Sequence, residues 1–350
     1  MKHELTHLDE NNQPTMVNIT EKGISARYAV AEARVQLPPE MAPLFKGGEI
    51  QGKKGPVFQT AIIAGTMAAK RTHEFIPFCH QIPVESCKIR IECDEKLLVT
   101  IRARVETTFK TGVEMEALHA ASIAALTIYD MCKAVSHRIV ILDTKLVAKA
   151  GGKRTVFSRP LCGLVLTGGK SERMGRDKAL LEYRGKPHAL YLYELLSQYC
   201  DETFLSAKAN QWAGTALGPL PLIVDEKPGQ GPSGALLSAF HARPEANWIV
   251  LACDLPYFDE AALKTLLAQA DEEKTVGTFF KNAEKGFPEA LAGFYTPAAE
   301  KLFASAMDSG IGCPVKTLRG ANVKLLDSSS VNLANANTQD DFGKARHEIR

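Results

Sequence analysis

The sequence lacks a long apolar run. Its longest apolar stretches, such as 249–253 and 120–131, are short or interrupted by polar residues, whereas a membrane-spanning helix needs about 20 consecutive apolar residues. The first ten residues, MKHELTHLDE, are polar and acidic, which is unlike a signal peptide. We therefore expect a cytoplasmic protein with no membrane partner.

The sequence also lacks a dominant charge and a cysteine framework. Lys and Arg number 42 against 40 Asp and Glu, for a net charge of +2, so no global field favours a nucleic-acid partner. None of the eight cysteines forms a C-x-x-C pair, which excludes a zinc ribbon or thioredoxin motif and favours reduced thiols. There is no internal repeat, and 350 residues suggest about two domains.

A composition change near residue 155 divides the chain. Segment 145–159 carries five basic residues, two glycines and no acid, and the apolar run LCGLVLTGG follows it. An apolar strand that ends in glycines is typical of the first strand of an α/β domain that binds phosphates. The sequence therefore predicts domains at 1–155 and 156–350.

The two parts have different patterns of apolar residues. In the first, helices are expected at 57–72 and 112–135 and strands at 86–91 and 97–107, which predicts an α+β sandwich of the ferredoxin-like kind, with helices on one face of one sheet. In the second, strands at 161–166, 202–207, 221–225, 247–252, 275–280 and 289–295 alternate with helices at 187–199, 233–243, 258–270 and 297–307. This rhythm predicts a Rossmann-like, three-layer α/β sandwich with a largely parallel sheet.

Titratable side chains stand out in the first part. They are Lys54, His80, Glu114, Glu116, Asp130, Lys133 and Lys149. Structural roles alone would account for some of them: Thr111 and Glu114 match a capping box, and Asp130 and Lys133 are spaced as a surface ion pair on a helix.

Together the segments that contain these residues resemble one family. KTGVEMEALHAAS, AALTIYDMCKAV, IPFCH and AKAGGK are similar to cyclic pyranopterin monophosphate synthases, the MoaC family, over about 3–153. The resemblance implies conversion of 3′,8-cyclo-7,8-dihydroguanosine 5′-triphosphate into cyclic pyranopterin monophosphate with release of pyrophosphate. It implies catalytic roles for Asp130, Lys133 and Lys54, and substrate-binding roles for Phe78, Cys79, His80, Glu114, Met115, Glu116 and Lys149. Gln81 replaces the family's proline after the histidine, and Ser25 replaces a threonine.

Helix geometry constrains such a site. Glu116 and Asp130 are 14 residues apart, so on one helix they face within about 40° of each other but are separated by about 21 Å along its axis. One small substrate cannot touch both. We therefore predict a homo-oligomer, formed through the N-terminal domain, with active sites shared between subunits.

The second part begins with a glycine-rich, basic loop. Residues 166–178 read LTGGKSERMGRDK, which matches neither a Walker A motif nor a dinucleotide-binding fingerprint. Gly168 and Gly169 allow the backbone to approach a phosphate, and Lys170, Arg173 and Lys178 supply positive charge. The sequence predicts a phosphate-binding loop here. It also predicts a second cluster of positive charge, in the first part, around Lys54, Lys133 and Lys149.

This loop resembles the signature of molybdenum cofactor guanylyltransferases, the MobA family. The similarity extends over about 160–348 through VDEKPGQGPSGAL, VLACDLPYF and NANT; Thr167 replaces an alanine and Ser206 an asparagine. It implies GMP transfer from GTP to the terminal phosphate of molybdenum-molybdopterin. It implies GTP-binding roles for Leu166, Thr167, Gly168, Lys178, Ser206, Asp225 and Asp254, with Mg²⁺ on Asp254, Asn337 as a second candidate ligand, and no bound organic cofactor.

Three alternatives stay open. The second domain could be a cytidylyltransferase, or a sugar-phosphate nucleotidyltransferase, on the same fold. One domain could instead be a non-catalytic assembly module. Asp254 could also serve only as a helix N-cap. The favoured interpretation predicts small-molecule ligands: cyclised dihydro-GTP, GTP and molybdopterin.

Overall fold

A computed structural model describes residues 13–52, 55–152, 155–168, 177–226, 229–282 and 286–349. The chain divides into two compact units, Met1–Ser158 and Arg159–Arg350. Lys54, Lys170 and Arg173 of the predicted sites lie outside the described residues.

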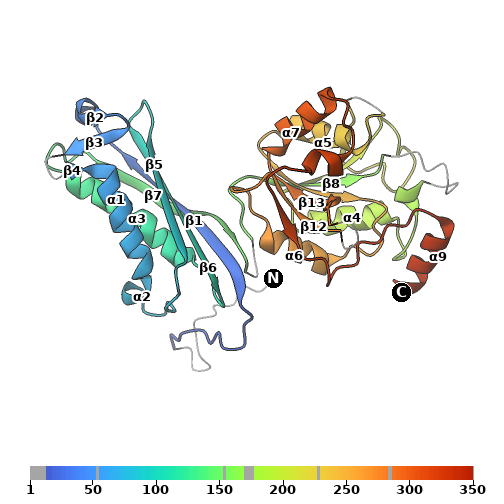
Figure 1. Cartoon of the computed structure of the whole chain (residues 1–350), viewed down its shortest axis with the longest axis horizontal. Coiled ribbons are helices and arrows are strands. Elements are labelled where there is room, and N and C mark those ends of the chain that lie inside the picture. The colour runs from blue at the N-terminus through green and yellow to red at the C-terminus, as the bar shows by residue number, and fades with distance from the viewer. Residues whose placement is uncertain are drawn as a thin grey trace. The chain divides into compact units, whose positions relative to one another are not determined.

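The first unit is a four-stranded antiparallel sheet with helices on one face (Figure 1). Its strands, in the order β5-β6-β1-β7, are β5 (Ser86–Cys93), β6 (Leu98–Phe109), β1 (Ser25–Gln36) and β7 (Val140–Ala150). The helices are α1 (Val57–Lys70), α2 (Thr72–Phe75) and α3 (Glu114–Cys132). A 3₁₀ turn, η1 (Pro39–Leu44), and the short strands β2 (Phe45–Lys46), β3 (Glu49–Gly52) and β4 (Gly55–Pro56) complete this unit.

Small side chains form the interface between sheet and helices. Ala29, Ala31 and Ala33 alternate along the inner face of β1, and α3 presents a row of buried alanines to them. At the crossing of α1 and α3, a Cβ atom on Gly65 would lie 2.7 Å from the Ala120 carbonyl oxygen. Only glycine therefore permits this close approach of the two helices.

The second unit contains a seven-stranded mixed sheet in the order β10-β9-β8-β11-β13-β12-β14. The first four strands run parallel: β10 (Leu222–Val224), β9 (Glu202–Ala207), β8 (Leu161–Leu166) and β11 (Asn247–Ala252). Next, β13 (Pro288–Tyr295) is antiparallel to β11 and to β12 (Gly277–Lys281), which pairs in parallel with β14 (Val323–Leu326). The predicted largely parallel sheet is confirmed.

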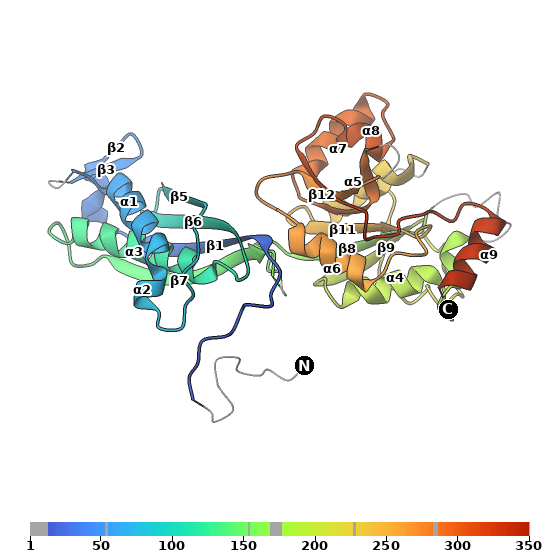
Figure 2. The same ribbon diagram turned by 60° about the horizontal axis from the view of Figure 1, so that its bottom comes forward.

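Helices cover both faces of this sheet (Figure 2). One face carries α5 (Gly231–Ala242), α7 (Ala299–Asp308) and α8 (Pro314–Leu318), which pack on a core around Trp248 and Phe240. The other carries α4 (His188–Ser197) and α6 (Glu260–Gln269). The last helix, α9 (Gln339–Glu348), lies beyond the strand ends (Figure 1). A 3₁₀ turn, η2 (Lys178–Leu180), follows β8 along the chain.

Several elements were not predicted. The sequence patterns gave no strand at β1 or β7, two of the four strands in the first sheet, and no element at β14, α8 or α9. All eight cysteines are free thiols, as expected. Within the described residues, no helix is both long and apolar enough to cross a membrane.

Candidate active sites

An acidic and basic cluster lies at the N-terminal end of α3. The Lys149 ammonium on β7 lies 2.9 Å from Oε1 of Glu114. The predicted capping box is wrong: Val113 is the N-cap residue of α3, and no side chain caps it. The Glu114 carboxylate instead folds back over Gly112, where an added Cβ would lie 2.0 Å from Oε2.

Glu116 is the most unusual group in this cluster. It is only 2% exposed, and within the described residues its Oε2 has no hydrogen-bond partner. The Cys79 thiol donates a weak hydrogen bond to Oε1 over 3.9 Å. Desolvation raises the pKa of Glu116 to about 7, and burial together with Glu116 raises the pKa of Cys79 to about 11. Glu116 can therefore hold or release a proton near neutral pH.

The other predicted substrate-binding residues of this domain lie around the same end of α3 or on the loop that contains Cys79. His80 is half-buried on that loop, which joins α2 to β5. Phe78 and Met115 are 41% and 39% exposed. Exposed apolar side chains of this size next to a buried carboxylate are suited to contact a ligand or another protein chain.

The predicted acid/base pair lies at the opposite end of α3. The Lys133 ammonium is 2.7 Å from Oδ1 of Asp130, and both side chains are about half exposed, at 51% and 50%. Because α3 is one continuous helix from Glu114 to Cys132, about 21 Å of helix rise separates Asp130 from Glu116. Within one chain the structure therefore brings Glu114, Glu116, Cys79 and Lys149 together but leaves Asp130 and Lys133 apart from them.

The raised pKa of Glu116 predicts a pH-dependent stability. The folded unit keeps this proton up to about pH 7, whereas the unfolded chain releases it near pH 4.5. The free energy of unfolding should therefore fall by roughly 3 kcal/mol at most as the pH rises from 4.5 past 7. Scanning calorimetry should show this slope in the wild type but not in Glu116→Gln. Replacing the exposed Glu95 by glutamine should keep the wild-type slope; the same slope in Glu116→Gln would contradict the prediction.

In the second unit, the predicted nucleotide residues converge at the carboxyl ends of parallel strands. Leu166 ends β8, Ser206 lies at the end of β9, Asp225 follows β10 and Asp254 follows β11. This edge is where α/β sheets bind ligands. A cavity of ≈ 450 Å³ opens there, lined by Leu166, Gly168, Ser206, Lys208, Gln211, Asp225, Gly229, Gly231, Pro232 and Ala235. Its size suits a nucleoside.

Asp225 is oriented inside this cavity by Ser206. The Ser206 hydroxyl donates a hydrogen bond of 2.9 Å to Oδ1 of Asp225. Burial raises the pKa of Asp225, while Ser206 and the charge of Lys208 oppose the rise. A Cβ on Gly168 would lie 3.7 Å from Oδ2, so the backbone that precedes the glycine-rich loop lies close to this carboxylate.

A second cluster contains Lys178, Asp254 and Asn337. The Lys178 ammonium lies 2.6 Å from Oδ1 of Asn337 and 3.7 Å from Oδ2 of Asp254. The Ala336 N–H donates to the Asp254 carbonyl oxygen, which fixes the NANT segment beside Asp254. Burial raises the pKa of Asp254, and Lys178 opposes that rise. Asp254 is not a helix N-cap, since Asp259 caps α6.

This cluster fits a divalent cation that also binds phosphate. Asp254 offers a carboxylate that is 23% exposed, and Asn337 offers an amide oxygen. Within the described residues there is no group of three or more His, Cys, Asp or Glu side chains for a metal cage. One carboxylate with substrate phosphates and water is the usual set for Mg²⁺.

A buried hydrogen-bond network holds the end of β8. The Trp212 indole N–H donates 3.0 Å to the Thr167 hydroxyl, which donates 2.7 Å to the Ser206 carbonyl oxygen. Thr167 thus replaces the family's alanine with a group that ties this strand end to its neighbour. Trp212, Lys208 and Gln211 were not among the predicted site residues. The lysine and glutamine lie just beyond β9, which was the available signal.

Thr167→Val should destabilise the second unit by about 1–3 kcal/mol, because the buried indole N–H would lose its acceptor. Trp212 and Trp248 are the chain's two tryptophans and both lie in this unit, so urea unfolding followed by tryptophan fluorescence reports on it selectively. Thr265→Val is the control, since that hydroxyl forms an exposed hydrogen bond to the Ala261 carbonyl oxygen within α6. Equal unfolding free energies for both variants would contradict the role of this network.

Comparison with known proteins defines the class of each unit. Residues 16–152 match the MoaC family, and residues 163–320 match the MobA-like NTP transferase domain. A "Molybdenum cofactor biosynthesis bifunctional protein" of Synechocystis sp. is 50% identical over 344 residues, which cover 97% of this chain and 99% of the relative. The chain therefore belongs to the family of bifunctional molybdenum cofactor biosynthesis proteins.

Two further matches each cover one unit. A "Cyclic pyranopterin monophosphate synthase" of Xanthomonas axonopodis pv. citri is 51% identical over 152 residues, covering 43% of this chain and 92% of the relative. A solved structure titled molybdopterin-guanine dinucleotide biosynthesis protein A, from Archaeoglobus fulgidus, is 21% identical with a TM-score of 0.45, covering 53% of this chain and 97% of that one.

Proposed function

We propose that the chain catalyses two reactions of molybdenum cofactor biosynthesis. The first unit converts 3′,8-cyclo-7,8-dihydroguanosine 5′-triphosphate into cyclic pyranopterin monophosphate and pyrophosphate. The second transfers GMP from GTP to molybdenum-molybdopterin and releases pyrophosphate. The observation that carries the proposal is the cluster of Lys178, Asp254 and Asn337. Asp254 follows β11 at the same strand-end edge where the nucleoside-sized cavity opens, in a chain 50% identical over 344 residues to a bifunctional relative.

In the first reaction, protons must move on and off ring atoms while the carbon skeleton rearranges. Glu116, with a pKa of about 7, is suited to hold or give such a proton at neutral pH. Lys149 and His80 are assigned to the phosphates, and Asp130, Lys133 and Lys54 to acid/base steps. The ion pair between Lys133 and Asp130 keeps the ammonium charged, and this charge stabilises the departing pyrophosphate.

In the second reaction, an oxygen of the acceptor phosphate attacks the α-phosphorus of GTP. The new bond joins that oxygen to the α-phosphorus, the bond to the β-phosphate oxygen breaks, and pyrophosphate leaves. Lys178 neutralises charge on the reacting phosphates, while Asp225, oriented by Ser206, holds the nucleoside. Asp254 and Asn337 would hold Mg²⁺, which supplies further neutralisation of phosphate charge when bound.

The first activity is proposed to need two subunits. The two groups of site residues occupy opposite ends of α3, so a complete site pairs the N-terminal end of one α3 with the C-terminal end of the partner's.

The βαββαβ order of the main elements and the strand order β5-β6-β1-β7 support a ferredoxin-like domain. Because the two reactions lie at different stages of the pathway, co-localisation is the role proposed for the fusion, not channelling.

The test is product analysis on the whole chain. Mass spectrometry should detect cyclic pyranopterin monophosphate from the cyclised substrate, and a guanine dinucleotide from molybdenum-molybdopterin, GTP and Mg²⁺. Parallel reactions with CTP and ATP test base selectivity. Turnover with CTP alone would reject guanylyl transfer, and a lack of either product would reject that activity.

A further inference from the structure

The loop that begins with Asp254 is held through its backbone. Residues 254–256 lie between β11 and α6. Their three carbonyl oxygens accept hydrogen bonds, in chain order, from the Ala336 N–H at 2.9 Å, the His188 ring at 3.0 Å and the Arg184 guanidinium at 2.9 Å. We call these three donors the carbonyl clamp. The clamp fixes the stretch of backbone from which the Asp254 side chain projects.

His188 is the buried side-chain donor of the clamp. It is 1% exposed, and burial lowers the pKa of its ring to about 4, so the ring is neutral near pH 7. Because a carbonyl oxygen can only accept, the single ring proton is on Nε2. Within the described residues, Nδ1 has no hydrogen-bond partner. A buried polar atom that stays unpaired is unusual, and the paired nitrogen of the same ring bonds to the residue that follows Asp254.

Aromatic rings fix the orientation of this imidazole. The Tyr191 ring is stacked with it, with centroids 5.8 Å apart and an angle of 15° between the planes, and the Tyr183 ring packs edge-on at 5.2 Å. The Arg184 guanidinium lies 4.3 Å from the centroid of Tyr191. The two side-chain donors of the clamp therefore share one aromatic support, and the imidazole cannot turn Nε2 away without losing these contacts.

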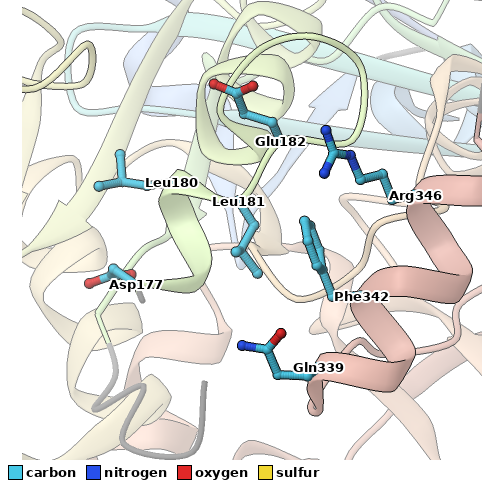
Figure 3. Close-up of a pocket in the computed structure, with 7 residues that line it drawn as sticks. All are labelled: Asp177, Leu180, Leu181, Glu182, Gln339, Phe342 and Arg346. Carbon is cyan, nitrogen blue, oxygen red and sulfur yellow. The ribbon is translucent and has the colours of Figure 1, made fainter. Parts of the chain in front are cut away.

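The segment before His188 is a short hairpin that borders open space. The His188 N–H donates to the Leu181 carbonyl at 2.8 Å, and Glu182 forms an antiparallel bridge with Pro187. Leu181 and Glu182 line a cavity of ≈ 810 Å³, opposite the side chains of α9 (Figure 3). Close packing therefore restrains this hairpin less than it would a core segment. The hydrogen bonds of the clamp then have a larger share in fixing the hairpin to the Asp254 loop.

We propose that His188 is a positioning residue for guanylyl transfer, which acts through the Leu255 carbonyl to hold the Asp254 carboxylate beside Lys178 and the metal. The inference rests on the guanylyl transfer proposed above. Oδ2 of Asp254 lies 3.7 Å from the Lys178 ammonium, and a shift of the loop would change both this distance and the direction of the carboxylate. The neutral ring restrains the loop without competing with a cation for that carboxylate.

Two substitutions separate the donor from the volume of the ring. His188→Gln places an amide N–H close to the position of Nε2, whereas His188→Leu fills similar space without a donor. The Leu255 carbonyl also accepts from the Phe258 N–H at 3.2 Å, so this oxygen keeps a partner in both variants and the unit should still fold. Phe303→Leu is the stability control, because Phe303 is fully buried in α7, on the opposite face of the sheet from α4 (Figure 2).

The experiment uses the full chain and measures pyrophosphate release that depends on the molybdopterin acceptor. His188→Leu should lower kcat about 10–100-fold and raise the Mg²⁺ concentration for half-maximal activity, as is typical when the partner of a metal ligand is lost. At saturating Mg²⁺ its KM for GTP should change less than about 2-fold, because the nucleoside cavity is untouched. His188→Gln should stay within about 3-fold of the wild-type kcat, since it keeps the donor. Phe303→Leu should keep the wild-type kcat although its unfolding midpoint, followed by tryptophan fluorescence, falls.

Two further measurements distinguish positioning from a general structural role. In a chain that already carries Asp254→Asn, adding His188→Leu should lower kcat by less than about 3-fold, because the side chain that His188 positions has lost its function. In the metal-free chain, the amides of residues 254–258 should exchange hydrogen about 10-fold faster in His188→Leu than in His188→Gln.

The outcomes also separate this inference from the proposed function. A kcat of His188→Leu within about 3-fold of the wild type, an equal loss in His188→Gln, or the full 10–100-fold loss on top of Asp254→Asn overturns the inference. If the wild-type chain shows no transfer, the proposed function fails, and calorimetric titration of Mg²⁺ into the chain with GTP decides. Weaker Mg²⁺ binding by His188→Leu than by His188→Gln then supports the positioning of Asp254, and equal binding overturns it.

Discussion

Replacing Asp254 by asparagine is expected to reduce guanylyl transfer by about 10²–10³-fold. The substitution keeps the shape and the half-buried position of the side chain but removes its negative charge. Lys178, 3.7 Å away, then loses the attraction of this carboxylate, and the metal loses the one carboxylate that the described cluster offers it. The loss should appear in kcat at saturating GTP, measured as pyrophosphate release that depends on the molybdopterin acceptor.

The bifunctional chain supplies the control for this variant. Formation of cyclic pyranopterin monophosphate by the same preparation should stay at the wild-type rate, because Asp254 belongs to the second unit. The variant should also need a higher Mg²⁺ concentration for half-maximal residual activity. Transfer within about three-fold of wild type, in a preparation whose first activity is intact, would remove Asp254 from the reaction.

Sequence patterns predicted the second unit better than the first for a physical reason. Buried parallel strands are continuous apolar runs, so β8, β9 and β11 were predicted with the bounds that the structure has. In β1 the inward face is formed by Ala29, Ala31 and Ala33. Alanine gives a weak apolar signal, and this central strand was therefore missed.

The candidate sites show a similar limit. Patterns of sequence placed Ser206 and Asp225 each near a strand end, but their hydrogen bond follows only from the pairing of β9 with β10. The capping box expected from Thr111 and Glu114 does not form, because the Glu114 carboxylate pairs with Lys149 instead. Lys149 lies 35 residues after Glu114 in the chain. The contact between the Phe342 and Tyr183 rings joins the last helix to a segment about 160 residues earlier, which no local pattern encodes.

Two inactive variants of the first activity are expected to restore each other when they are mixed. Glu116→Gln alters the N-terminal end of α3, and Lys133→Met alters its C-terminal end. Each alone should lower the formation of cyclic pyranopterin monophosphate by about 10²–10⁴-fold, because each removes a group proposed to move or stabilise charge. If a site takes one end from each subunit, co-expressed variants form mixed dimers in which one of the two sites is intact.

Random pairing sets the size of this recovery. Half of the dimers contain one chain of each kind, and half of their sites are intact, so about a quarter of the wild-type activity should return after co-expression. Sites built within single chains would instead give no recovery. A chain with both substitutions provides the converse control: mixed equally with wild type, it should leave about a quarter of the activity if sites are shared and about half if they are not. Guanylyl transfer, which neither substitution touches, measures the amount of folded protein in every mixture. Shared sites then differ from single-chain sites by the recovery of activity in the co-expressed variants and by a factor of two in the control.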